Sequence, residues 1–264
     1  MEIRISFVSI KSIFNKKNLG NELMTFLIKG SYNQNKPVPS YKFYSKIIGE
    51  LLRARKNFGC EIEGVLVELR KYLRLDLKEA RKIKDSFYGG TYQYVFLCIF
   101  LYVFVFLLKK IVNIELDYLK LIFILIYHSF GLLIYFFACK LIQRAEFKYF
   151  DSYFNTVYLL RSLLLVSRPI SEVIDRIKVS KLAINNNFIN INDRLITLLR
   201  QLKHSGKLNL LDLDNLILEV WDTFEIKVES YERKITVLKL LLMSFFILPS
   251  FLFIIFCMIS AMNL

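Results

Sequence analysis

The sequence predicts an all-α membrane protein with three transmembrane helices and two helical cytoplasmic domains. Hydrophobic residues make up 55% of its 264 residues and the mean hydropathy is +0.41, which exceeds the values usual for soluble globular chains. Three long stretches contain no charged residue. The remaining segments carry the net charge of +14, and with this hydrophobicity it favours either contact with an anionic membrane surface or loops kept on the cytoplasmic side.

Residues 1–39 are expected to form a loosely structured lead-in, because polar residues and proline follow one another from Asn33 to Pro37. The first residues, Met1 to Lys11, contain no apolar core of a secretion signal, so the N-terminus is expected to stay in the cytoplasm. Residues 40–90 are expected to form the first helical cytoplasmic domain.

The three charge-free stretches are predicted to cross the membrane. A helix that rises ~1.5 Å per residue needs about 20 residues to cross the hydrocarbon layer. Residues 91–108 and 121–139 therefore form a predicted transmembrane hairpin over 91–139, and residues 240–264 form the third span. The alternative for the two shorter stretches is a pair of buried helices in a large soluble core.

The charges flanking the spans predict their orientation. Residues 1–90 carry 18 basic and 9 acidic side chains, and residues 140–239 carry 16 and 12. Because cytoplasmic loops are enriched in Lys and Arg, both segments should lie inside and the connector 109–120 outside. Lys109 and Lys110 oppose this weakly, although at the end of a span both can reach the headgroups.

Residues 140–239 predict a second helical cytoplasmic domain. Ser205-Gly206 should end one amphipathic helix, with Gly206 in a left-handed conformation. From Asn215 onward, apolar residues recur at steps of three and four, with Trp221 and Phe224 in the middle, and lead into the third span. A further amphipathic helix is predicted upstream from Phe150, Tyr153, Phe154, Val157 and Leu160.

Four acidic residues lie beside this apolar stripe. At 100° per residue they fall within about 80° of one another on the helix. They form either a solvated face or a docking strip for a basic partner surface. These residues are Asp222, Glu225, Glu229 and Glu232.

The two cytoplasmic segments also resemble each other. Leu51-Leu52-Arg53 matches Leu159-Leu160-Arg161, and similar apolar patterns follow at Ile62–Arg70 and Ile170–Lys178. The first copy turns at Asn57-Phe58-Gly59. Either an internal duplication or chance similarity between apolar helices explains the match.

Residue patterns typical of enzymes are missing from the sequence, so neither a catalytic site nor a cofactor is expected. The two histidines, His128 and His204, have no ligand at i+3 or i+4, and the four cysteines form no metal-binding spacing. His128 lies in the second span, where a hydrogen bond to a neighbouring helix competes with a role in a proton path or a gate. Pro249 should kink the third span, with Ser244 or Ser250 bonding the backbone groups that it frees. Basic residues are scattered without an aromatic platform, so no nucleic-acid partner is expected.

This arrangement resembles the inner-membrane platform, or F-domain, family of type II secretion systems and type IV pili. The similar features are the order of domains and spans and four local features. These are the helix, turn and apolar restart at Leu159 to Ile177, the stop at Ser205-Gly206, the long acidic-faced helix Asn215 to Lys234 and the proline at Pro249. The sequence departs from the family at Ser167-Arg168, where members usually carry Gly, and in its short first domain.

The resemblance implies a scaffold of the bacterial inner membrane without a catalytic site. It also implies a cytoplasmic hexameric ATPase and pilin or pseudopilin subunits as partners, contact with membrane lipid, and a homo-oligomer. Under this reading the four acidic residues are the partner-binding candidates, while Gly206, Trp221, Phe224 and Pro249 are structural. The alternative is a membrane subunit of a transporter or permease, in which His128 and Pro249 would lie at mid-membrane.

Overall fold

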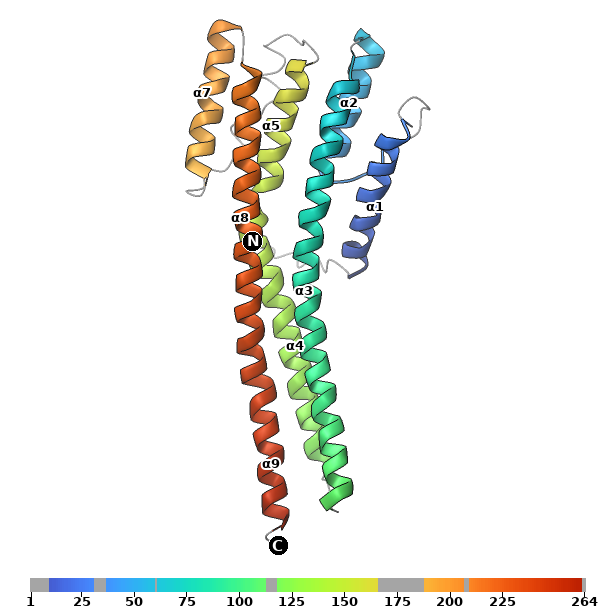
Figure 1. Ribbon diagram of the computed structural model, residues 1–264, viewed down its shortest axis with the longest axis vertical. Helices are drawn as coiled ribbons and strands as arrows, with labels where there is room; N and C mark the ends of the chain where they lie inside the picture. The colour runs from blue at the N-terminus through green and yellow to red at the C-terminus, as the bar shows by residue number, and fades with distance from the viewer. Residues whose placement is uncertain are drawn as a thin grey trace, which may run out of the picture. The chain divides into compact units, whose positions relative to one another are not determined.

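The computed structural model describes residues 10–30, 37–59, 61–112, 118–165, 188–206 and 209–262, and within these ranges it contains helices and no strand. The all-helical prediction is therefore confirmed for the described part of the chain (Figure 1). The elements are α1 (Ile10–Ile28), α2 (Tyr44–Phe58), α3 (Glu63–Val112), α4 (Tyr118–Phe147), α5 (Phe150–Leu165), α7 (Ile189–Ser205), α8 (Leu210–Leu242), the π-helical turn η4 (Met243–Ile247) and α9 (Leu248–Met262).

Three of the described helical stretches are long and apolar enough to cross a membrane. They are Glu63–Lys110, Tyr118–Leu165 and Leu210–Cys257, and they contain the first two predicted spans and most of the third. Only 17%, 22% and 22% of the residues in their most apolar 18-residue windows are buried. Apolar side chains that remain this exposed are typical of lipid-facing helices rather than of a soluble core, which favours the membrane interpretation.

The chain divides into two compact units. Unit 1 consists of Met1–Ala80 and Tyr149–Glu225, and unit 2 of Arg81–Lys148 and Ile226–Leu264. Unit 1 thus combines residues from both segments that the sequence assigns to separate helical domains. Helices α3 and α8 each contribute residues to both units.

Aromatic residues join the two segments inside unit 1. Helix α2 packs against α5, and the Phe43 ring stacks on Phe154 and Tyr158 at centroid distances of 6.1 and 5.8 Å. Tyr72 of α3 lies 4.8 Å from the ring of Tyr158. Helices α2 and α5 contain the similar sequences Leu51-Leu52-Arg53 and Leu159-Leu160-Arg161, and these two helices pack on each other.

The lead-in contains a helix that the sequence analysis did not predict. Helix α1 buries Leu23, Phe26 and Leu27, which lie on one face at helical spacing. Gly20 allows a close approach, since a Cβ atom there would lie 2.7 Å from Leu77 Cδ2 and 2.9 Å from Tyr41 Cε2. Packing against other parts of unit 1 therefore accounts for the helix.

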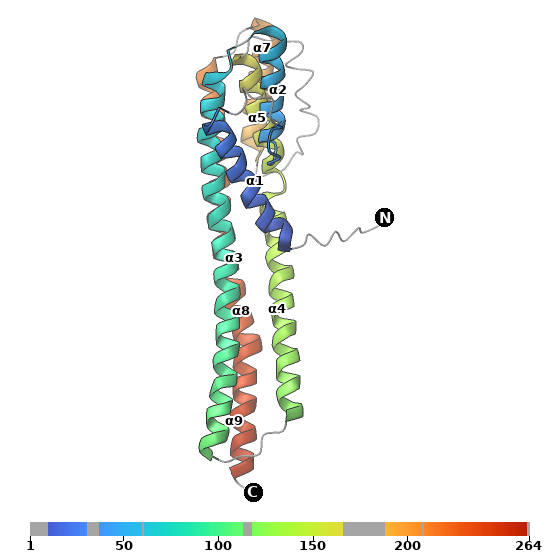
Figure 2. The ribbon, with the colours of Figure 1, turned by 90° about the vertical axis from the view of Figure 1, so that its right-hand side faces the viewer.

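In unit 2 the later part of α3, helix α4 and the α8–α9 segment lie side by side (Figures 1 and 2). Two glycines bring these helices close together. A Cβ atom on Gly90 would lie 2.0 Å from the Tyr135 hydroxyl, and one on Gly131 would lie 2.4 Å from the Tyr94 hydroxyl. The buried core residues are Tyr94, Tyr135, Cys139, Tyr231, Ile235, Leu242 and Phe246, with a second cluster of Leu101, Val105, Ile124 and Ile254.

Local signals explain several helix ends. Helix α2 ends at Phe58, where Gly59 has a φ of 66°, and α7 ends at Ser205, where Gly206 also has a φ of 66°. Each glycine N–H bonds a carbonyl four residues back, as expected for a left-handed helix end. Helix α8 begins after Asn209, whose side-chain oxygen accepts a 3.1 Å hydrogen bond from the N–H of Leu211.

Candidate functional site

Helix α8 has two different faces in unit 1. Trp221 and Phe224 are only 8% and 6% exposed. The indole N–H of Trp221 donates a 2.5 Å hydrogen bond to the buried hydroxyl of Tyr158. Both side chains pack on Phe154, with ring centroids 4.6 and 5.7 Å away. The part of the predicted apolar stripe around Trp221 and Phe224 therefore belongs to the unit 1 core.

The acidic residues predicted as a docking strip lie on the same helix, outside the core. Asp222 and Glu225 are exposed in unit 1. In unit 2, Glu229 is exposed and Glu232 is partly exposed. These carboxylates thus lie beside the buried aromatic stripe, where a partner surface or water can approach them.

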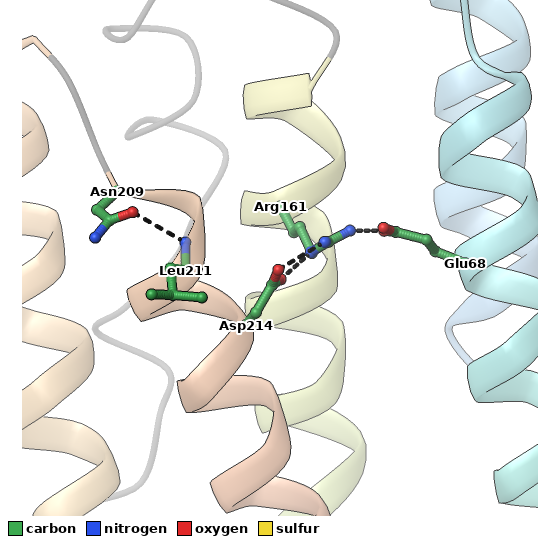
Figure 3. Close-up of polar contacts among 5 residues, drawn as sticks. All are labelled: Glu68, Arg161, Asn209, Leu211 and Asp214. Atoms are coloured by element: carbon green, nitrogen blue, oxygen red, sulfur yellow. Dashed lines mark hydrogen bonds and ion pairs between the residues drawn. The ribbon is translucent and has the colours of Figure 1, made fainter.

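A buried arginine connects three helices of unit 1 (Figure 3). Arg161 on α5 donates to both carboxylate oxygens of Asp214 on α8, from Nε at 2.5 Å and from Nη2 at 3.0 Å. A further ion pair joins Arg161 Nη1 to Glu68 on α3. The Arg161 side chain is 11% exposed, while those of Asp214 and Glu68 are 35% and 39% exposed. Two carboxylates thus compensate one buried charge, as burial of a guanidinium requires.

A second cluster of charges and hydroxyls lies where the start of α2 and the residues just before it meet α3. Asp76 is buried, with the Lys42 ammonium 2.6 Å from Oδ1 and the Tyr41 hydroxyl donating to Oδ2 at 3.0 Å. Burial and the charge of Asp76 raise the pKa of Tyr41 above its usual range, and the same two causes raise the pKa of the neighbouring Tyr44. Both phenols are therefore held in their neutral form in the folded protein.

In unit 2 a single carboxylate ties two helices together. Glu146, near the end of α4, forms ion pairs with Lys227 at 3.4 Å and with Lys234, both on α8. The Glu146 side chain is only 7% exposed. Tyr231, which lies between the two lysines in sequence, packs its ring 5.7 Å from that of Phe147. Two basic residues of α8 are thus directed to α4 in unit 2.

The third predicted span contains the π-helical turn η4 immediately before Pro249. Pro249 has no N–H, so the carbonyl of Phe245, four residues earlier, has no α-helical donor. The Tyr127 hydroxyl of α4 donates a 2.7 Å hydrogen bond to that carbonyl. Ser250, which the sequence offered as a donor, bonds the Phe246 carbonyl at 2.8 Å instead.

His128 lies next to Tyr127 and is 5% exposed. Its Nδ1 atom lies 3.2 Å from the Tyr102 hydroxyl of α3, within hydrogen-bonding distance. The His128 carbonyl accepts a hydrogen bond from the Tyr94 hydroxyl at 3.1 Å. The Nε2 atom is buried and has no hydrogen-bond partner among the described residues. The expected hydrogen bond between helices is therefore present at Nδ1.

The cysteines and His204 are the remaining side chains with metal-binding or nucleophilic chemistry. Cys98, Cys139 and Cys257 are free thiols, and Cys60 lies outside the described residues. His204 is exposed near the end of α7. The described residues contain no group of three or more His, Cys, Asp and Glu side chains that could hold a metal ion.

Two of these arrangements were missed by the sequence analysis. The signal for Arg161 is a single charge within the apolar run Leu159–Leu165, which is typical of a buried ion pair. The signal for Tyr127 is weak, because nothing in the sequence shows which hydroxyl reaches the carbonyl freed by Pro249. The predicted helix after Pro169 and the turn at Arg168-Pro169 lie outside the described residues.

Comparisons with known proteins leave the family of the chain open. Neither a protein-family model, nor a curated protein, nor a solved structure matches it.

Proposed function

We propose that this chain is the inner-membrane platform protein of a type II secretion or type IV pilus-like machine. In this proposal it couples a cytoplasmic ATPase to the assembly of pilin or pseudopilin subunits. It spans the bacterial inner membrane three times, its N-terminus lies in the cytoplasm, and both helical segments face the cytoplasm. The three candidate spans and the helical unit 1 agree with this arrangement.

The two-faced helix α8 carries the proposal. Its aromatic residues hold it in the unit 1 core, while Asp222 and Glu225 remain on its outer side. A scaffold needs such a surface, because a partner can bind the exposed carboxylates without disturbing the buried stripe. The complementary partner is a basic surface on the ATPase or on a neighbouring subunit.

Charge reversal tests the partner surface. Glu225→Lys/Glu229→Lys should fold and insert normally, since exposed substitutions usually change stability by no more than about 0.5 kcal/mol. The variant should nevertheless lose secretion or pilus assembly, because like charges in the complex repel. Glu61→Lys/Asp193→Lys is the matched control, since both residues are exposed acids away from this part of α8. Full secretion or pilus assembly by the α8 variant would contradict the proposal and leave these carboxylates as a solvated face.

A transporter or permease subunit is the second candidate. The π-helical turn before Pro249 and the buried His128 favour it, because transporters place broken helices and ionisable groups at mid-membrane. Co-purification from native membranes distinguishes the two functions. A platform protein should co-purify with a secretion or pilus ATPase, whereas a permease subunit should move a solute in sealed vesicles without that ATPase.

A further inference from the structure

The strongest unexplained feature of unit 2 is the way in which Pro249 is accommodated. Every α-helical residue normally receives a hydrogen bond at its carbonyl from the N–H four residues later. Because Pro249 cannot donate this bond, the Phe245 carbonyl has no α-helical donor and can accept a hydrogen bond from another group. In the hydrocarbon region no water is present to supply one, and an unsatisfied carbonyl costs several kcal/mol.

Two observations describe the hydrogen bonding around Pro249. The Tyr127 hydroxyl reaches it from α4 at 2.7 Å. The helix widens over Met243–Ile247, where the N–H of Leu248 bonds the Met243 carbonyl five residues back. Wide turns of this kind interrupt the regular α-helical bonding and frequently occur at functional positions.

The surroundings place Tyr127 at a junction of the three membrane helices. The adjacent His128 contacts Tyr94 and Tyr102 of α3, as described above. On the other side the Tyr127 ring packs on Phe246 with centroids 4.7 Å apart. Both residues of this hydrogen bond are partly exposed at the surface of the helix bundle, since Tyr127 is 36% exposed and Phe245 is 71% exposed. The hydrogen bond therefore lies at the edge of the bundle, where a small outward movement of either helix breaks it.

We propose that Tyr127 is the lock of a hinge in the third span. Its hydroxyl supplies the hydrogen bond that Pro249 removes, and this bond holds the π-helical turn in one geometry. When the bond opens, the segment Leu248–Met262 is free to change its angle to residues 226–242. The proposed hinge depends only on contacts among the membrane helices. It therefore applies equally to a platform protein and to a transporter.

A double-mutant cycle tests the lock. Tyr127→Phe should lower the thermal midpoint of the detergent-purified full chain, because the Phe245 carbonyl loses its donor. In Pro249→Ala the restored N–H at position 249 can bond that carbonyl, so adding Tyr127→Phe should have a much smaller effect. Equal shifts in the two backgrounds would overturn the assignment, because Tyr127 would then act through packing alone. Tyr92→Phe, at an exposed tyrosine of α3, is the control for loss of a hydroxyl.

Spin labels test the hinge itself. Leu252 and Leu241 are 56% and 57% exposed and lie on opposite sides of the π-helical turn. A spin label at each position can therefore report the mobility of its own helical segment. Tyr127→Phe should increase the mobility of the label at 252 and leave the label at 241 unchanged. An unchanged label at 252, or an equal increase at both positions, would show that Tyr127 does not lock a hinge.

Discussion

The indole N–H of Trp221 on α8 donates a 2.5 Å hydrogen bond to the hydroxyl of Tyr158 on α5, inside the core of unit 1. Trp221→Ala should therefore destabilise the protein by about 3–5 kcal/mol, because it removes a large buried ring as well as this bond. Leu218→Ala, at a residue of α8 that is 55% exposed, should have little effect. Denaturant unfolding of both variants in the same detergent measures the difference, and similar unfolding curves would show that the stripe is not a core.

Removal of the two carboxylates that pair with Arg161 should lower the free energy of unfolding more than removal of Arg161 itself. Removing both carboxylates, in Glu68→Gln/Asp214→Asn, leaves a buried guanidinium without a counter-charge and should cost about 3–5 kcal/mol. Arg161→Met should cost less, because Glu68 and Asp214 are more than a third exposed and water can solvate them. The free energies of unfolding of the two variants decide this. A larger loss for Arg161→Met would mean that the arginine acts chiefly through packing.

The sequence predicted the features that depend on local patterns. Charge-free runs located the apolar helices, helical periodicity placed Trp221 and Phe224 in a core, and Ser205-Gly206 marked the end of α7. Features that depend on which helices meet were not predictable. The helix α1 requires the contact of Gly20 with Leu77 and Tyr41, and a single sequence does not show that contact.

The same limit applies to the candidate sites. The proline and its freed carbonyl can be inferred from Pro249 alone, but the donor Tyr127 lies 118 positions earlier than Phe245 and only the packing of α4 identifies it. The acidic residues of α8 were predictable from spacing. Their exposure agrees with both interpretations, and a partner-binding measurement is what separates them.

Two neighbouring glycines of α3 provide a matched pair of substitutions. Gly90→Ala would place a Cβ atom 2.0 Å from the Tyr135 hydroxyl, which donates to the Phe87 carbonyl at 3.1 Å. This variant should lose about 1–3 kcal/mol through overpacking. Gly89→Ala meets no atom within 4 Å and should lose nothing. Thermal midpoints of the two variants test the close contact between α3 and α4, and equal midpoints would contradict it.

The pKa of Tyr41 predicts a loss of stability at alkaline pH. Because its folded pKa lies above the ordinary value of 10.0, the folded protein holds the phenol proton more tightly than the unfolded chain does. The resulting contribution to the free energy of unfolding is complete below pH 10 and is lost as the pH rises above 10. Thermal midpoints between pH 8 and pH 11 should fall less steeply in Tyr41→Phe than in the parent protein, with Tyr92→Phe as the exposed control. A slope that Tyr41→Phe leaves unchanged would assign the alkaline loss to other groups.

Labelling of single cysteines in spheroplasts tests the proposed membrane topology most directly. With Cys60, Cys98, Cys139 and Cys257 replaced, one cysteine is introduced at Asn57, at His204 or at Lys110, each of them exposed. A membrane-impermeant maleimide should label position 110 in intact spheroplasts, and positions 57 and 204 only after permeabilisation. Labelling of position 204 in intact spheroplasts would contradict an arrangement in which both helical segments face the cytoplasm.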